Sequence, residues 1–132
     1  MTDESKIEID WVTQRAACSV MDMFLSVKSG ALSDVEKRNV ISKATDKRHF
    51  FGFKDHGSGF SVYTEAVAVP VILEFRTSGS AISVSRNGNV IHTATITFTH
   101  ECECKLVVNG EELYPWQFRK KVLELLFFGE HV

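Results

Sequence analysis

The sequence has few of the residues that would assign it to a special class of protein. It contains three cysteines and two prolines in 132 residues, and its formal net charge is −2. A small, odd number of cysteines does not make a disulfide framework, so we expect reduced thiols and a cytoplasmic location. The near-neutral charge gives no reason to expect nucleic acid or an anionic membrane as a partner. No run approaches the ~20 apolar residues of a membrane span, and we expect no secretory signal peptide.

The sequence also lacks the motifs by which catalytic centres are recognised. Ser, His and Asp all occur, but there is no G-x-S-x-G nucleophile elbow. Residues 55–59 (DHGSG) are glycine-rich, yet no predicted helix follows them to hold a phosphate. We therefore predict no catalytic residue, no cofactor and no resident metal ion.

What the sequence does have is a globular composition, with 44% hydrophobic residues and ten phenylalanines. This composition fits one domain, residues 1–132, with an aromatic-rich core. The strongest local signal is Asn87-Gly88, which is typical of a β-hairpin turn. A two-residue loop at this point gives two mixed faces, whereas a three-residue loop, 86–88, separates apolar from polar side chains. We therefore predict the three-residue loop, because a slip of one residue would reverse the sorting.

This register divides the hairpin into two faces. It places Val84 opposite Val90 and Ile82 opposite His92. The apolar face then consists of Ile82, Val84, Val90, His92, Ala94, Ile96 and Phe98. The polar face consists of Ser83, Ser85, Ile91, Thr93, Thr95, Thr97 and Thr99. An antiparallel sheet of this kind is covered on its apolar face only.

Two helices are predicted before the strands. Apolar residues at helical spacing predict a helix over about 10–29, which Gly30 ends in a left-handed conformation. The capping-box pattern SDVE begins a second, short helix over about 33–44. A similar pattern at residues 5–8 and the side chain of Asp10 are alternative caps for the first helix.

Strands and one closing helix make up the remainder. The other predicted strands are residues 48–54, 60–65, 66–76 and 105–108. Pro70 argues against a central strand at 66–76, so this run either lies at a sheet edge or breaks at Pro70 with a bulge. A turn near residues 99–101 divides the long stretch 89–108. Pro115 suits the first turn of a final helix, and Gly129 ends it.

This order of elements predicts an α+β fold. We expect a single antiparallel sheet of about six strands in a meander, with the N-terminal and C-terminal helices packed on one face. In its order of elements the chain is similar to helix-grip folds, which hold apolar ligands between a sheet and a helix. The likeness is one of topology, which does not fix a function.

The first functional hypothesis is a non-enzymatic binding or interaction module. Many aromatic residues around a one-sided sheet favour an apolar cleft between the sheet and the C-terminal helix, and its ligand would be an apolar small molecule. The predicted ligand-binding residues are Val84, His92, Phe98, Trp116 and Phe118.

Two alternatives belong to other classes. A small enzyme would use His92 as a general base, or a metal centre would use His100, Cys102 and Cys104, which alternation places on one face of an extended strand. The competing interpretation of these cysteines is that they are small buried hydrophobic residues. The third hypothesis is a structural subunit of a homo-oligomer, such as a homodimer that forms through the Thr row or an open sheet edge.

Overall fold

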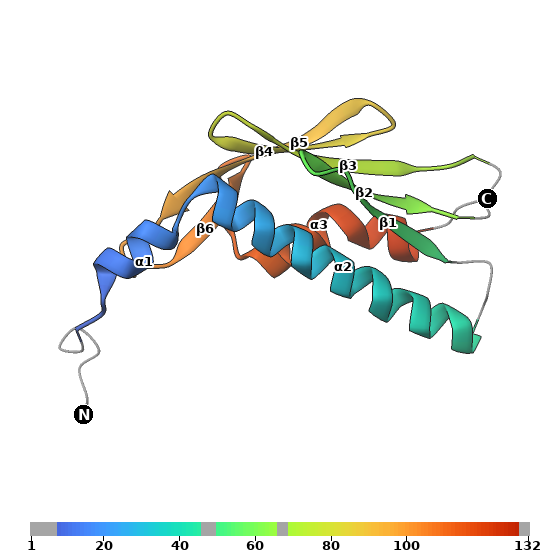
Figure 1. Ribbon diagram of the computed structural model, residues 1–132, viewed down its shortest axis with the longest axis horizontal. Coiled ribbons are helices and arrows are strands. Elements are labelled where there is room, and N and C mark those ends of the chain that lie inside the picture. The colour runs from blue at the N-terminus through green and yellow to red at the C-terminus, as the bar shows by residue number, and fades with distance from the viewer. Residues whose placement is uncertain (1–7, 46–49, 66–68, 130–132) are drawn as a thin grey trace.

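The protein is α+β, with one seven-stranded antiparallel sheet against which an N-terminal and a C-terminal helix pack. The computed structural model describes residues 8–45, 50–65 and 69–129. Its elements are α1 (Trp11–Ala17), α2 (Val20–Thr45), β1 (Phe51–Asp55), β2 (Gly59–Thr64), β3 (Ile72–Ser78), β4 (Ala81–Arg86), β5 (Asn89–Phe98), β6 (Cys104–Val108), β7 (Glu111–Leu113) and α3 (Pro115–Phe128). The strands follow the order β1 to β7 in a meander, and α2 and α3 form a second layer on one face (Figure 1). The predicted fold class is confirmed.

The β4–β5 hairpin has the predicted faces but a different loop. Arg86 pairs with Asn89, so the loop contains two residues, Asn87 and Gly88, and the predicted three-residue loop is wrong. Both loop residues have positive φ angles, 49° and 89°, as a type I′ turn requires. The register then shifts between Val84 and Ser85, where a bulge adds one residue to β5.

The bulge explains why the faces sort correctly despite the shorter loop. Val84 lies opposite His92 and Ile82 opposite Ala94, and Ile82, Val84 and Ala94 are fully buried beneath the helices. Thr95 is exposed on the other face, as predicted. Val90 is the exception, because it precedes the bulge, lies opposite Ser85 and is 63% exposed.

The two helices predicted before the sheet are divided at a different place. Helix α2 continues through Gly30 and the SDVE segment, so both the predicted stop at Gly30 and the predicted start at Ser33 are wrong. The break lies at Cys18-Ser19, between α1 and α2. Asp10 caps α1, with its carboxylate accepting from the Thr13 backbone N–H at 3.2 Å. The other candidate cap, residues 5–8, lies in part outside the described residues.

Gly30 has a packing role in place of the predicted one. A Cβ atom at this position would clash with the guanidinium group of Arg119 from α3. The missing side chain therefore lets Arg119 lie directly against α2. A glycine inside a helix lowers stability by about 1 kcal/mol relative to alanine. At this position the glycine allows α3 to approach α2 closely.

A disulfide joins Cys18 to Cys104. The expectation of three reduced thiols is therefore wrong, and Cys102 is the free cysteine. The bond links the break between the first two helices to the start of β6, across 86 residues of sequence. Helix α1 has no buried residue of its own, so this bond fixes the point at which the chain enters the folded layer. The cytoplasmic location stays a prediction.

The remaining strands follow the prediction, with one addition. The run after residue 69 breaks at Pro70, and β3 begins at Ile72. Asn109 and Gly110 both have positive φ angles and form a turn, which leads into a short seventh strand, β7, that was not predicted. Pro115 begins the last helix and Gly129 ends it, as predicted. Residues 48–49 and 66–68 of the predicted strands lie outside the described residues.

The core is a row of aromatic rings that joins the two layers. Phe60 of β2 lies 5.5 Å from the Phe24 ring of α2 and 4.5 Å from the Phe75 ring of β3, measured between ring centroids. Phe75 in turn meets Phe118 of α3 edge-on at 6.5 Å. Such ring pairs stabilise the fold beyond the burial of their apolar area. These phenylalanines therefore stabilise the contact between the helices and the sheet.

The edge strand β1 is closed in part by a side chain of α2. The Asn39 amide donates to the Phe51 carbonyl at 2.9 Å and accepts from the Phe51 N–H at 2.8 Å. Asn39 thus takes the place of a neighbouring strand at this residue. It protects backbone groups through which an open edge would pair with other chains.

Candidate functional site

The five residues predicted to line one cleft occupy four different surroundings. Val84 and Phe118 are fully buried in the core. His92 lines a cavity of about 100 Å³ between the sheet and α3. Phe98 lines a second cavity beside Cys18 and Ser19, and Trp116 is 56% exposed on the outer side of α3. The structure does not bring the five together, and ligand binding by this set stays a prediction.

The hypothesised His100/Cys102/Cys104 metal cluster is contradicted by the structure. The sulfur of Cys104 is bonded to Cys18, so it is not a free thiolate ligand. Residues 99–103 form a turn, not a strand, and Cys102 has a φ angle of 65°, so strand alternation does not apply. Within the described parts of the chain, no group of three His, Cys, Asp or Glu side chains could hold a metal ion.

One other surface from the sequence hypotheses, the Thr row, is open. Thr93 and Thr95 are exposed on the outer face of the sheet, and no helix covers that face in Figure 1. A homodimer through this face stays a prediction.

Within the ranges that the structure describes, no helix is both long and apolar enough to cross a membrane.

An apolar groove with a volume of about 340 Å³ lies between α2 and α3. We call it the α2–α3 groove. Its lining residues are Asp34, Lys37, Arg38, Ile41, Trp116, Arg119, Lys120, Leu123, Glu124, Phe127 and Phe128. The first four belong to α2 and the others to α3, so the groove lies between these two helices, which form one layer on one face of the sheet (Figure 1).

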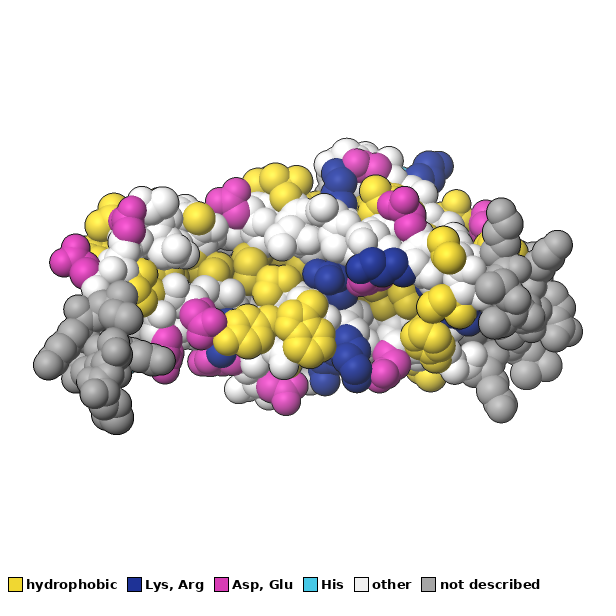
Figure 2. All heavy atoms as spheres, turned by 90° about the horizontal axis from the view of Figure 1, so that it is seen from below, with side chains coloured by type: hydrophobic (Ala, Val, Ile, Leu, Met, Phe, Trp, Pro, Cys, Tyr) yellow, Lys and Arg dark blue, Asp and Glu magenta, His cyan; other side chains and the backbone are white. Residues whose placement is uncertain are grey.

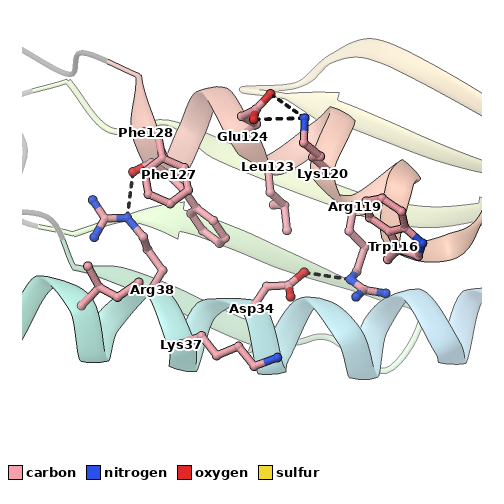
Figure 3. Close-up of a pocket in the computed structure, with 11 residues that line it drawn as sticks. Asp34, Lys37, Arg38, Trp116, Arg119, Lys120, Leu123, Glu124, Phe127 and Phe128 are labelled. Atoms are coloured by element: carbon pink, nitrogen blue, oxygen red, sulfur yellow. Dashed lines mark hydrogen bonds and ion pairs between the residues drawn. The ribbon is translucent and has the colours of Figure 1, made fainter.

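Two arginines cross the groove in opposite directions (Figure 3). Arg38 of α2 donates from Nε to the Phe127 carbonyl oxygen at 2.9 Å. Arg119 of α3 donates from Nε to Asp34 Oδ2 at 2.8 Å. Leu123 lies between the two bridges and is buried, so the floor of the groove is apolar. The bridges fix the spacing of α2 and α3 and thereby the width of the groove.

Large apolar side chains are exposed at both ends of the groove. Trp116 is 56% exposed at one end, and Phe128 and Ile41 are 66% and 49% exposed at the other. Figure 2 shows this side of the molecule, where hydrophobic side chains lie on either side of a group of Lys and Arg side chains. Isolated exposed apolar residues are ordinary, but aromatic residues around one concave surface mark a binding site.

The rim of the groove carries an excess of positive charge. Lys37, Arg38, Arg119 and Lys120 are cationic, whereas Asp34 and Glu124 are anionic, which leaves a formal excess of two positive charges. Both carboxylates are already paired, Asp34 with Arg119 and Glu124 with Lys120 at 3.1 Å. Lys37 has no hydrogen-bond or ion-pair partner among the described residues. The rim is thus positive on a protein whose net charge is −2.

The Arg38 side chain is held in place by aromatic rings. Its guanidinium carbon lies 4.9 Å from the centroid of the Phe128 ring and 5.5 Å from that of Phe51. Its Nη1 also donates to Ser42 Oγ at 2.7 Å. Because Arg38 is fixed in this way, Phe128 is held at the end of the groove although it is mostly exposed.

The α2–α3 groove was not among the sites predicted from the sequence. A signal was present in the segment 115–128, whose apolar positions are too many for one buried stripe on a helix. Trp116, Leu125 and Phe128 are the surplus, and each is at least 56% exposed.

Comparison with known proteins finds no matching family model, no matching curated protein and no matching solved structure. The function is therefore inferred from the geometry of the groove.

Proposed function

We propose that the protein is a non-enzymatic interaction module whose α2–α3 groove binds an amphipathic helix of another protein, with acidic residues beside the apolar face of that helix. The observation that carries this proposal is the combination of exposed aromatic side chains at both ends of the groove with an unneutralised positive rim between them. An amphipathic helix in a groove between helices is a recurring mode of peptide recognition.

The length of the groove supports a helical segment as the occupant. Trp116 and Phe128 are twelve positions apart on α3, which corresponds to about 18 Å along a helix at ~1.5 Å per residue. A partner helix that lies along α3 would present apolar anchors over the same length, at positions i, i+4, i+7 and i+11. A small apolar molecule would contact one end of the groove and leave the aromatic residues of the other end in water.

The charge of the rim supports a foreign partner over a second copy of this chain. In a two-fold dimer the same surface meets itself, so two positive rims would face each other. An acidic stripe on the partner neutralises Lys37 and Arg38, and electrostatic attraction of this kind raises the rate of association. It also makes the affinity depend on salt.

The proposal is tested with two synthetic, fluorescein-labelled peptides of eighteen residues. Both carry Leu and Phe on one helical face; one has Glu on both flanks of that face and the other has Lys. Fluorescence anisotropy with the full chain is expected to show that the Glu peptide binds about tenfold more tightly than the Lys peptide, and that high salt reduces the difference. Equal affinities, or no binding of either peptide, would overturn the proposal.

A matched pair of tryptophan variants locates the site. Trp116→Ala removes the aromatic anchor of the groove and is expected to weaken binding of the Glu peptide about tenfold or more. Trp11→Ala removes a tryptophan of similar exposure, 59% against 56%, from α1, outside the groove. It is expected to leave the affinity unchanged. If both variants weaken binding equally, the peptide does not occupy the groove.

A further inference from the structure

The cavity beside His92 has a different chemistry from the α2–α3 groove. It lies between the sheet and α3, on the other side of that helix, and has a volume of about 100 Å³. Its wall is apolar, with Leu73 of β3 and Val122 and Leu126 of α3 all buried. At about 30 Å³ per water molecule this volume is that of a few small groups, such as a carboxylate or a phosphate group. It is too small for a large apolar ligand.

Three nitrogen-bearing side chains line this cavity, and no carboxylate does. They are Arg86 at the end of β4, His92 of β5 and Lys121 of α3. The side chains of Arg86 and Lys121 have no hydrogen-bond or ion-pair partner among the residues that the structure describes. The lining therefore carries two formal positive charges without a counter-charge.

The imidazole of His92 adds an unsatisfied polar atom. Its Nδ1 is buried and has no hydrogen-bond partner in the described structure. A buried polar atom that lacks a partner costs about 1–3 kcal/mol, and a ligand that bonds to it recovers part of this cost. Burial, with a smaller contribution from Lys121, lowers the pKa of His92, so the ring is neutral at pH 7 and its tautomer is open to selection by a ligand.

We propose that this cavity binds a small oxyanion, a carboxylate or phosphate group, which Arg86 and Lys121 attract and which accepts a hydrogen bond from His92 Nδ1. The guanidinium fork of Arg86 matches two oxygens of either group. Leu73, Val122 and Leu126 shield one side of the bound anion from water, which strengthens its hydrogen bond to His92, whereas Arg86 and Lys121 are exposed. The proposal is independent of the function proposed for the α2–α3 groove.

The test follows the ring nitrogens of His92 by NMR while the full chain is titrated with sodium acetate or sodium phosphate, with sodium chloride at matched ionic strength as the reference. A saturable shift of the Nδ1 resonance with acetate, with phosphate or with both supports the proposal, and the stronger ligand identifies the class. No shift beyond that caused by chloride would overturn it. Binding is expected to tighten as the pH falls below 6.5 and through the lowered pKa of His92, because protonation of the ring adds a third positive charge beside Arg86 and Lys121.

Variants distinguish a built site from general attraction to a charged surface. Lys121→Gln and Arg86→Gln are each expected to weaken binding about tenfold, since each removes a charged hydrogen-bond donor. Lys54→Gln is the matched control, because this exposed lysine lies at the end of β1 and does not line the cavity. Circular dichroism shows whether each variant is folded. An equal loss in Lys54→Gln and Lys121→Gln would mean that an adventitious ion only is bound, and would overturn the proposal.

Discussion

Removal of the Cys18–Cys104 disulfide is predicted to cost a large part of the stability of the protein. The bond closes a loop with a sequence separation of 86 residues. In the chain-entropy model such a loop removes about 4.6 kcal/mol of conformational freedom from the unfolded state at 25 °C, and loss of a native disulfide typically costs about 2–5 kcal/mol. A domain of this size has a free energy of unfolding of only about 5–15 kcal/mol.

The assay is urea unfolding of a Cys18→Ser/Cys104→Ser double variant, followed by circular dichroism. Both cysteines are replaced so that neither is left to form a mixed bond with Cys102. Cys102→Ser is the matched control, because it removes the free thiol and leaves the disulfide in place. We expect a lower unfolding midpoint for the double variant and a much smaller change for the control. Equal midpoints for the two proteins would refute the reasoning.

Two further predictions concern single side chains. Asn39→Ala leaves the Phe51 N–H and carbonyl of the edge strand without their partners, and urea unfolding is expected to show a loss of about 1–3 kcal/mol. The pKa of His92 is held below its ordinary value of 6.5 by burial and by the charge of Lys121, and Arg86 is the other charged residue that lines its cavity. The folded protein therefore binds fewer protons than the unfolded chain, so its stability is complete above pH 6.5 and declines as the pH falls through that value. Unfolding at a series of pH values should show a shallower decline for His92→Gln, and an unchanged slope would contradict the assignment.

The sequence predicts the sheet and its covered face because these depend on local patterns. Alternation along residues 81–98 is sufficient to place Ile82 and Ala94 beneath the helices and Thr95 outside. The loop length was wrong because two devices, a shorter turn and a bulge, produce the same sorting of faces. A pattern of faces alone does not distinguish them.

The errors in the helical region have a tertiary cause. Gly30 has the sequence signal of a helix end, but its missing side chain accommodates Arg119, which lies 89 positions further along the chain. The pairing of Cys18 with Cys104 likewise depends on which segments meet in the fold. Neither contact leaves a local pattern that sequence reasoning can use.

The α2–α3 groove was unpredictable for the same reason. Its rim combines Lys37 and Arg38, which resemble a solvated helix face, with residues from a helix near the other end of the chain. What the sequence does contain is an apolar surplus in α3. Trp116 was placed in the predicted cleft, but the structure turns it to the outer side of α3.

Reversal of the charge at Lys37 tests whether the α2–α3 groove recognises an acidic helix. The Lys37→Glu variant reverses one charge of the groove rim, and Lys54→Glu makes the same change in the overall charge at the end of β1, outside the groove. Fluorescence anisotropy is expected to show that Lys37→Glu weakens binding of the Glu peptide and strengthens binding of the Lys peptide. Lys54→Glu is expected to change the affinity for neither peptide. If the preference for the Glu peptide is the same in Lys37→Glu and Lys54→Glu, the groove is not the site of recognition.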